Sequence, residues 1–465
     1  MTTNIDSWSF VHMRIKNALF SGALWLGIGT FIAKFLGAVY RIPLTNKLGG
    51  LGLGLYQMVF PIYALLLDFS GAGLPSALSR IIAMQEDKDA VAKRLLSSSI
   101  KLFLSLGVLA SIFMAVFSSS LARLQGNEGA KTAYLFLSPA IMFVSVISCF
   151  RGYFQAYLDM RPTAISQIIE QGVKLVFGLI FINAFMPNIS LSVGGATLAI
   201  TISELVALIY LYLKYKGFSA RKPSQTALEK GTFIKDAKTI IKTTIPITLV
   251  GIMLPLSHVI DSFVIINILK GYTSSATALY GLLSGVVMTV INLPVSVCYG
   301  ISTVAVPSVS SCKTQSEINS RSKKIIVLTT IVALPCAIFL SAFAPFTINL
   351  LFNNLPNVQK GIAIKLLTIC SPCVLLLSLV QSSNAVLIGS GKLYMPVKTL
   401  GIGIIIKTVL NLILLSNKKL NIYGSAMAII ACYFSVCLIN LILISKKGRQ
   451  NENETTKSGQ FICQK

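Results

Sequence analysis

Long apolar stretches separated by short polar connections follow one another along almost the whole chain. A helix needs about 20 residues to cross the hydrocarbon core of a bilayer. Twelve stretches meet this length: 18–41, 52–84, 95–119, 131–152, 162–187, 191–213, 242–269, 277–311, 325–352, 362–388, 393–416 and 421–445. The pattern therefore predicts an all-α polytopic membrane protein with about twelve transmembrane helices.

Two of these stretches, 52–84 and 277–311, are too long for a straight crossing. Both contain residues that break helices, and we expect both to be bent or broken where protein or water covers the freed backbone. The breakers are Gly71, Gly73 and Pro75 in the first stretch and Pro294, Gly300 and Pro307 in the second.

The composition excludes a soluble protein. Of the 465 residues, 54% are hydrophobic and only 12% are charged, whereas a soluble domain carries about 25% charged residues. The mean hydropathy of +0.77 points the same way. Such a chain could not cover its surface with polar groups.

A large excess of basic residues gives the chain a net charge of +25. With the N-terminus in the cytoplasm, 27 of the 40 basic residues fall on the cytoplasmic side and nine outside. This split follows the positive-inside rule. It predicts a multi-pass protein of the bacterial cytoplasmic membrane with both termini cytoplasmic, a first span that is not cleaved, and no nucleic-acid partner.

The spans fall into two related halves. Gly195-Ala-Thr-Leu-Ala199 recurs as Gly424-Ser-Ala-Met-Ala428, and Lys174 has a counterpart in Lys407. We expect parallel repeats with the substrate between them, arranged as a V-shaped transporter. The predicted parts are an N-terminal lobe of six spans (1–213), a cytoplasmic linker (214–241), a C-terminal lobe of six spans (242–446) and a cytoplasmic tail (447–465).

Ionisable residues inside spans are functional candidates, because a charge facing lipid is costly. The candidates are Lys34, Arg41, Asp68, Glu170, Lys174, Glu204, His258, Asp261 and Lys407.

The acidic candidates and the histidine have two interpretations each. They could bind a coupling ion, or they could be structural. Glu170 and Lys174 are one turn apart, as in a helical ion pair, and His258 and Asp261 share a face as a polar pair. Asp68 precedes a predicted bend and could cap its freed amides. The sequence leaves these alternatives open.

The basic candidates point to an anionic cargo. Lys34 and Lys407 lie too deep in their spans to reach the cytoplasmic interface, and Lys174 is the repeat mate of Lys407. Arg41 either joins them or extends to the outer interface. Lysine is a strong point-charge partner for phosphate, so we expect these four residues to bind a phosphate or pyrophosphate in a central cavity.

The cysteines do not form a disulfide or metal pattern. Most lie in apolar runs, and the Cys370–Cys373 pair encloses Pro372 within such a run. With two histidines in the whole chain, we predict no metal site and no cofactor.

The first two spans carry a resemblance. Ala33-Lys-Phe-Leu-Gly37, Tyr40-Arg-Ile-Pro-Leu44, Leu48-Gly-Gly-Leu-Gly-Leu-Gly-Leu-Tyr-Gln57 and Phe69-Ser-Gly-Ala-Gly-Leu-Pro-Ser-Ala-Leu-Ser79 closely resemble the stage V sporulation protein B and MurJ-like branch. That branch belongs to the multidrug/oligosaccharidyl-lipid/polysaccharide (MOP) exporter superfamily.

This resemblance implies a flippase, not an enzyme, that moves an undecaprenyl-pyrophosphate-linked saccharide such as lipid II across the membrane by alternating access, without hydrolysing nucleotide. Coupling to H⁺, Na⁺ or the membrane potential and a monomeric state go with it. Members usually have fourteen spans, and this chain has twelve, which leaves open how the lipid tail is held.

Two other functions compete with the flippase as interpretations of the sequence. A cation-coupled multidrug antiporter of the same superfamily needs an acidic cavity, which the deep lysines disfavour. A membrane-bound polymerase or ligase acting on the same lipid usually needs catalytic groups on substantial outer loops. The predicted outer connections are short, and Glu128 is their only acidic residue.

Overall fold

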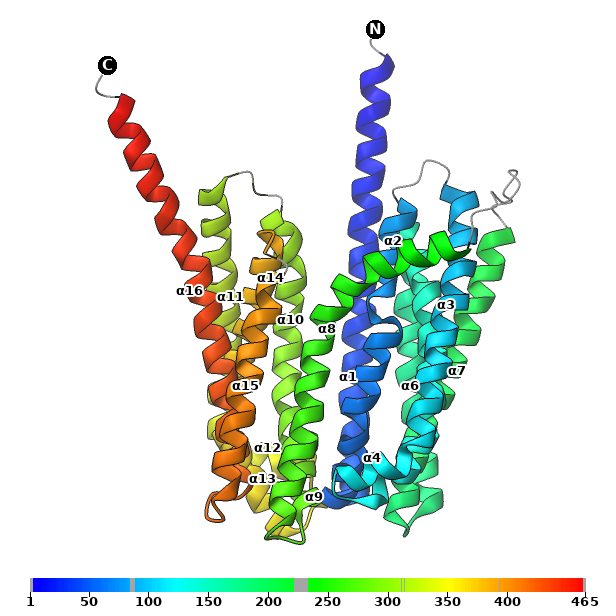
Figure 1. Cartoon of the computed structure of the whole chain (residues 1–465), viewed down its shortest axis with the longest axis vertical. Helices are drawn as coiled ribbons and strands as arrows, with labels where there is room; N and C mark the ends of the chain where they lie inside the picture. The colour runs from blue at the N-terminus through cyan, green and yellow to red at the C-terminus, as the bar shows by residue number, and fades with distance from the viewer. Residues whose placement is uncertain are drawn as a thin grey trace. The chain divides into compact units, whose positions relative to one another are not determined.

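The computed structural model describes residues 3–83, 88–220, 233–310, 312, 314–392 and 394–462. Throughout these ranges, all of the regular structure is helical (Figure 1). Eleven helical segments are long and apolar enough to cross a membrane. The predicted all-α membrane architecture is therefore confirmed. Helices suit this setting because they satisfy their own backbone hydrogen bonds without water.

The helices follow one another with short connections. The first part of the chain forms α1 (Thr3–Leu67), η1 (Asp68–Ala72), α2 (Leu74–Ala83), α3 (Lys88–Val116), α4 (Ser118–Leu124), η2 (Glu128–Ala130), α5 (Lys131–Ala156), α6 (Arg161–Phe185) and α7 (Ile189–Ala220). The second forms α8 (Phe233–Lys270), α9 (Ala276–Tyr280), η3 (Gly281–Val287), α10 (Met288–Ser310), α11 (Gln315–Ala342), α12 (Ala344–Leu351), α13 (Asn357–Cys370), α14 (Pro372–Gly389), α15 (Met395–Ser416) and α16 (Ile422–Ile462).

The chain divides into two compact units that exchange segments. Unit 1 contains Met1–Leu44 and Met58–Leu256, and unit 2 contains Thr45–Gln57 and Ser257–Lys465. The middle of α1 therefore packs in unit 2, and the first part of α8 packs in unit 1. The predicted linker at 214–241 is largely helical, because α7 continues to Ala220 and α8 already begins at Phe233.

A buried ion pair holds the start of α8 in unit 1. The Arg94 Nε of α3 lies 3.2 Å from the Asp236 Oδ2 of α8, and the Ser98 hydroxyl donates to the same oxygen at 3.1 Å. Asp236 is 6% exposed. Asp236 lies in the segment predicted as a linker, and in the structure it packs α8 against α3.

The glycine-rich run of the first two spans packs closely against α9 and η3 within unit 2. Gly49 has a positive φ of 62°, and this kink joins two helices within α1. A Cβ on Gly54 would lie 2.0 Å from the Thr277 carbonyl oxygen, and one on Gly281 would lie 2.3 Å from the carbonyl oxygen of Gly50. Only glycine permits these approaches. Because the two helices joined at this kink form one uninterrupted apolar segment, Phe35–Ala83, eleven segments are found where twelve were predicted.

The structure agrees with the predicted break in one of the two long stretches and differs from it in the other. In 52–84 the π-helical turn η1 and the start of α2 at Leu74 confirm the break. In 277–311 the prediction is wrong about the place: the irregular turn is η3, and α10 runs without interruption through Pro294, Gly300 and Pro307. Proline and glycine are tolerated in membrane helices where neighbouring groups satisfy the backbone.

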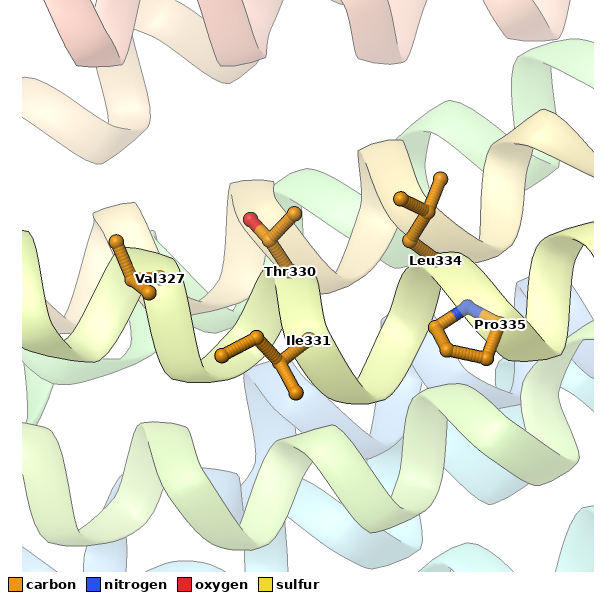
Figure 2. Close-up of a pocket in the computed structure, with 5 residues that line it drawn as sticks. All are labelled: Val327, Thr330, Ile331, Leu334 and Pro335. Carbon is orange, nitrogen blue, oxygen red and sulfur yellow. The ribbon is translucent and has the colours of Figure 1, made fainter.

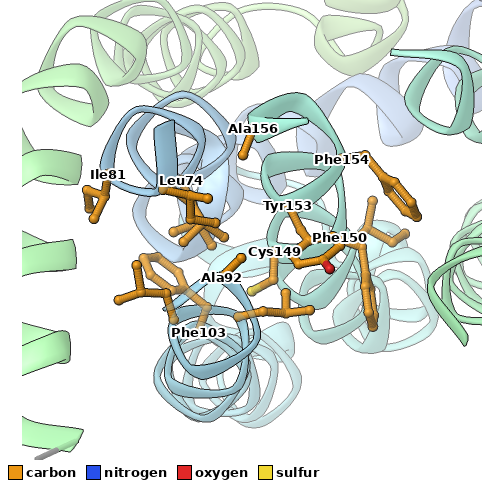
Figure 3. Close-up of a cluster of buried hydrophobic side chains, with 14 of the residues drawn as sticks. Leu74, Ile81, Ala92, Phe103, Cys149, Phe150, Tyr153, Phe154 and Ala156 are labelled. Atoms are coloured by element: carbon orange, nitrogen blue, oxygen red, sulfur yellow. The ribbon is translucent and has the colours of Figure 1, made fainter. Parts of the chain in front are cut away.

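A cluster of buried side chains holds unit 1 together (Figure 3). It joins Leu74 of α2, Phe103 of α3 and Phe150 and Tyr153 of α5, and it extends to Ile240 of α8. The cluster fixes α8 against the helices that carry the charged residues described below.

Candidate functional site

A buried ion pair connects α8 and α15 in unit 2. The Lys407 Nζ lies 2.6 Å from the Asp261 Oδ2, and the two residues are 4% and 6% exposed. Lys407 also donates to the Ser257 hydroxyl. The lysine that the sequence placed in an anion-binding set has its charge balanced by an acidic partner.

Two further polar groups surround this pair. The Asn411 Nδ2 of α15 donates to the Asp261 Oδ1 at 3.4 Å, and the His258 Nδ1 lies 4.0 Å from the Asp261 Oδ2. The spacing of His258 and Asp261 thus places them near each other, as predicted. The short contact of Asp261, however, is with Lys407.

Lys174 of unit 1 has different surroundings. Its Nζ lies 5.8 Å from the centre of the Tyr40 ring of α1, and it is only partly buried. The adjacent Arg41 is close enough to repel it electrostatically, while Glu170 and Glu204 attract it. The charge of Lys174 is shared among several groups instead of being matched by one carboxylate.

Glu170 makes its direct ion pair with a residue at the end of the predicted span 131–152. The Arg151 Nη2 of α5 lies 3.0 Å from the Glu170 Oε2 and donates to the Ser166 hydroxyl at 3.0 Å. Glu204 of α7 is 5% exposed and shares a hydrogen bond with Glu170. The predicted Glu170–Lys174 pair therefore lies inside a larger cluster.

Asp68 begins the π-helical turn η1 of unit 1. No side-chain cap is formed there, so the predicted capping of freed amides is not observed. Across the described residues, no charged side chain acts on its carboxylate. A Cβ on Gly251 of α8 would lie 3.7 Å from the Asp68 Oδ2.

The structure therefore brings together Arg41, Lys174, Glu170 and Glu204 in unit 1 and His258, Asp261 and Lys407 in unit 2. The Lys34 side chain lies outside the described residues. Sequence reasoning missed Tyr40, Arg151, Ser257 and Asn411. Arg151 could have been found, because it follows an apolar run directly and the helix does not end before it.

An apolar hollow lies on one helix of unit 2 (Figure 2). It measures about 270 Å³. It is lined by five residues of α11: Val327, Thr330, Ile331, Leu334 and Pro335. Because most of these side chains are apolar and Ile331 is 63% exposed, the hollow suits contact with lipid better than binding of a charged group.

Comparison with protein families gives one extended match. The model of the family described as polysaccharide biosynthesis protein matches residues 19–313. This range covers more than half of the chain. It includes the charged residues that the structure brings together in unit 1, namely Arg41, Arg151, Glu170, Lys174 and Glu204.

Two proteins of Bacillus subtilis (strain 168) are similar over almost the whole chain. Lipid II flippase MurJ is 25% identical, with 93% of this chain and 83% of that protein covered. Stage V sporulation protein B is 27% identical, with 93% and 84% covered.

Solved structures share the fold. A MATE family multidrug resistance transporter of the MOP superfamily in an inward-facing conformation has a TM-score of 0.70 at 17% identity, covering 90% of this chain and 94% of that one. Lipid II flippase MurJ in an inward closed conformation has the same TM-score and identity, with 91% and 87% covered. The fold is that of a MOP-type transporter.

Proposed function

The chain belongs to the polysaccharide biosynthesis protein family, and from this membership we propose that it is a flippase for an undecaprenyl-pyrophosphate-linked saccharide. Lipid II or a related precursor of the cell wall or spore cortex is the proposed substrate. The similarity to a lipid II flippase and to a sporulation protein supports this class of cargo.

The observation that carries the proposal is the placement of Lys174 beside Arg41. Two like charges on neighbouring helices repel each other, and an anion bound by both would relieve that repulsion. Arginine and lysine are the side chains that most often bind phosphate oxygens. We assign the pyrophosphate to Arg41 and Lys174. Lys34, in the same span as Arg41, joins them on the sequence evidence.

The direction of transport follows from the charge of the cargo. With both termini in the cytoplasm, the protein takes the lipid from the inner leaflet and releases it in the outer leaflet. An inside-negative potential assists the outward movement of an anion by about 2.3 kcal/mol per charge per 100 mV.

A multidrug antiporter of the same fold is less well supported. The MATE and MurJ structures match this chain with equal TM-scores, so the fold does not separate the two functions. The side chains do. Asp261 is matched by Lys407 and Glu170 by Arg151, so neither carboxylate is available to hold a cationic drug in this structure.

The test is a leaflet assay in proteoliposomes with fluorescent lipid II as the probe. We expect the variant Arg41→Gln/Lys174→Gln to lower the flipping rate about 100-fold, because each charge-assisted contact contributes about 1.5–3 kcal/mol. The matched control is Lys101→Gln/Arg123→Gln, which removes two exposed positive charges and should keep the wild-type rate.

Two outcomes would contradict the proposal. Equal rates for the wild type and the Arg41→Gln/Lys174→Gln variant would remove the assigned head-group site. Failure of the unmutated protein to flip lipid II or any other undecaprenyl-pyrophosphate-linked saccharide would remove the function itself.

A further inference from the structure

The carboxylates at membrane depth differ in what neutralises them. Asp261 has an ammonium partner at 2.6 Å, and Glu170 has a guanidinium partner at 3.0 Å. Glu204 shares a hydrogen bond with Glu170 and is attracted by Arg151 and Lys174. Asp261 and Glu170 thus have cationic partners, and the hydrogen bond between Glu204 and Glu170 requires a proton on one of the two carboxyl groups.

Asp68 stands apart from these networks. Over the part of the chain that the structure describes, it has no hydrogen bond and no ion pair. Asp68 is half-buried, and an ionised carboxylate that loses part of its water without gaining a partner takes up a proton more readily than one in bulk water. Ionisable residues of this kind inside a span mark ion or proton pathways.

The local backbone makes room for the carboxyl group. Asp68 opens η1, a π-helical turn, and such turns occur frequently at functional sites. The facing residue on α8 is Gly251, whose missing side chain leaves the Asp68 Oδ2 next to the helix backbone. A larger residue at 251 would cover the carboxylate.

The neighbours of η1 carry no charge that could replace a proton. Ser145 and Ser148 of α5 face Gly71, and Thr244 and Thr248 of α8 face Gly73. In the described portions of α2, α3, α5 and α8, no titratable side chain acts on Asp68. Its protonation state therefore depends on the surrounding water and on its own burial.

We propose that Asp68 is a proton-binding site of this protein, at which uptake and release of H⁺ accompany transport. A proton needs one carboxylate oxygen, whereas a hard cation such as Ca²⁺ takes about 6–8 oxygen ligands. Na⁺ likewise needs several oxygen ligands, and a single carboxylate does not supply them. Proton binding itself does not depend on the cargo, and only its coupling to transport rests on the proposed function.

The test measures proton binding separately from flipping. The full chain is placed in lipid nanodiscs without substrate, and infrared difference spectra are recorded while the pH is lowered. We expect a carbonyl band of a protonated carboxyl group that is lost in Asp68→Asn and present, at a shifted frequency, in Asp68→Glu, whereas the separate band of the Glu170–Glu204 pair is kept in both variants. Asp159→Asn, a loop carboxylate that accepts a hydrogen bond from the Arg161 amide, is the matched control and should keep the band.

A difference spectrum that is the same in Asp68→Asn as in the wild type overturns the proposal, and so does loss of the Asp68-dependent band on addition of NaCl at constant pH, because Na⁺ would then be the ligand. In proteoliposomes, the flipping rate of fluorescent lipid II should depend on an imposed pH gradient in the wild type and become insensitive in Asp68→Asn. A wild type that shows the band but flips no lipid would refute the proposed function and leave the proton site in place.

Discussion

Lys407 in unit 2 and Lys174 in unit 1 occupy matching positions of the two sequence repeats, but their surroundings differ. Lys407 is 4% exposed and bound to one carboxylate at 2.6 Å. Lys174 is partly buried, lies over an aromatic ring and is close to another positive charge. One lysine connects two helices through a single carboxylate, whereas the other lies among several charged groups, where the proposed function assigns it to the anionic cargo.

This difference shows that charge and depth do not by themselves identify a binding residue. A buried ion pair is a structural element, because removing one partner leaves the other charge uncompensated. The partly buried Arg41 and Lys174 are the pair that the proposed function assigns to an anion. Three substitutions would test the comparison.

The largest effect on stability is expected for Lys407→Ala. It leaves Asp261 buried without its partner and should lower the free energy of unfolding by about 3–5 kcal/mol. The measurement is thermal unfolding in detergent, followed with a thiol-reactive dye, because cysteines such as Cys149, Cys298 and Cys370 are buried in the folded protein.

Replacing both partners provides the control. Lys407→Met/Asp261→Leu should recover most of the lost stability, since apolar residues of similar size often replace a buried ion pair without cost. Wild-type stability of the single variant would mean that the pair does not hold α8 to α15.

Lys174→Gln is expected to give the opposite pattern. The free energy of unfolding should change by less than about 1 kcal/mol, as for partly exposed charges. The rate of lipid II flipping in proteoliposomes should fall about tenfold, the effect of losing one charge-assisted contact. A large loss of stability without a change in rate would make Lys174 a second structural lysine.

The smallest effect is expected for Arg151→Lys. The variant keeps the positive charge near Glu170 but loses the planar fork that reaches both Glu170 and Ser166, because a lysine ammonium is a point charge. We expect a loss of about 1 kcal/mol in the free energy of unfolding, measured with the same dye. An unchanged melting temperature would show that the contacts of the Arg151 guanidinium with Glu170 and Ser166 do not contribute to the stability of the protein.

The sequence predicted contacts between residues of one helix and missed contacts between residues that are far apart along the chain. The spacing of His258 and Asp261 predicted their proximity, because residues three apart share a helix face. The pairing of Lys407 with Asp261 joins residues 146 positions apart, and no periodicity within one helix reports such a contact. Arg151 was missed for a related reason: it lies at the end of the predicted span and counts among the cytoplasmic basic residues, whereas α5 extends beyond it to Ala156.

The fold shows the same division. Hydropathy determined the helices, since each span must bury its apolar side chains in lipid or protein and satisfy its backbone internally. The break near Gly71 was also readable from the sequence, whereas the break at η3 depends on the close packing of Gly54 and Gly281 and was placed wrongly.

The sequence by itself thus determined the all-helical membrane class and the approximate span positions, and it identified the charged residues within the predicted spans. Only the tertiary structure decided which of those charges neutralise one another, because an ion pair between helices depends on distances that the order of residues does not contain. It also decided that the middle of α1 packs in unit 2 and the start of α8 in unit 1. Close packing of glycine against backbone holds the first segment, and the buried Arg94–Asp236 pair holds the second. Both contacts join residues that are far apart along the chain.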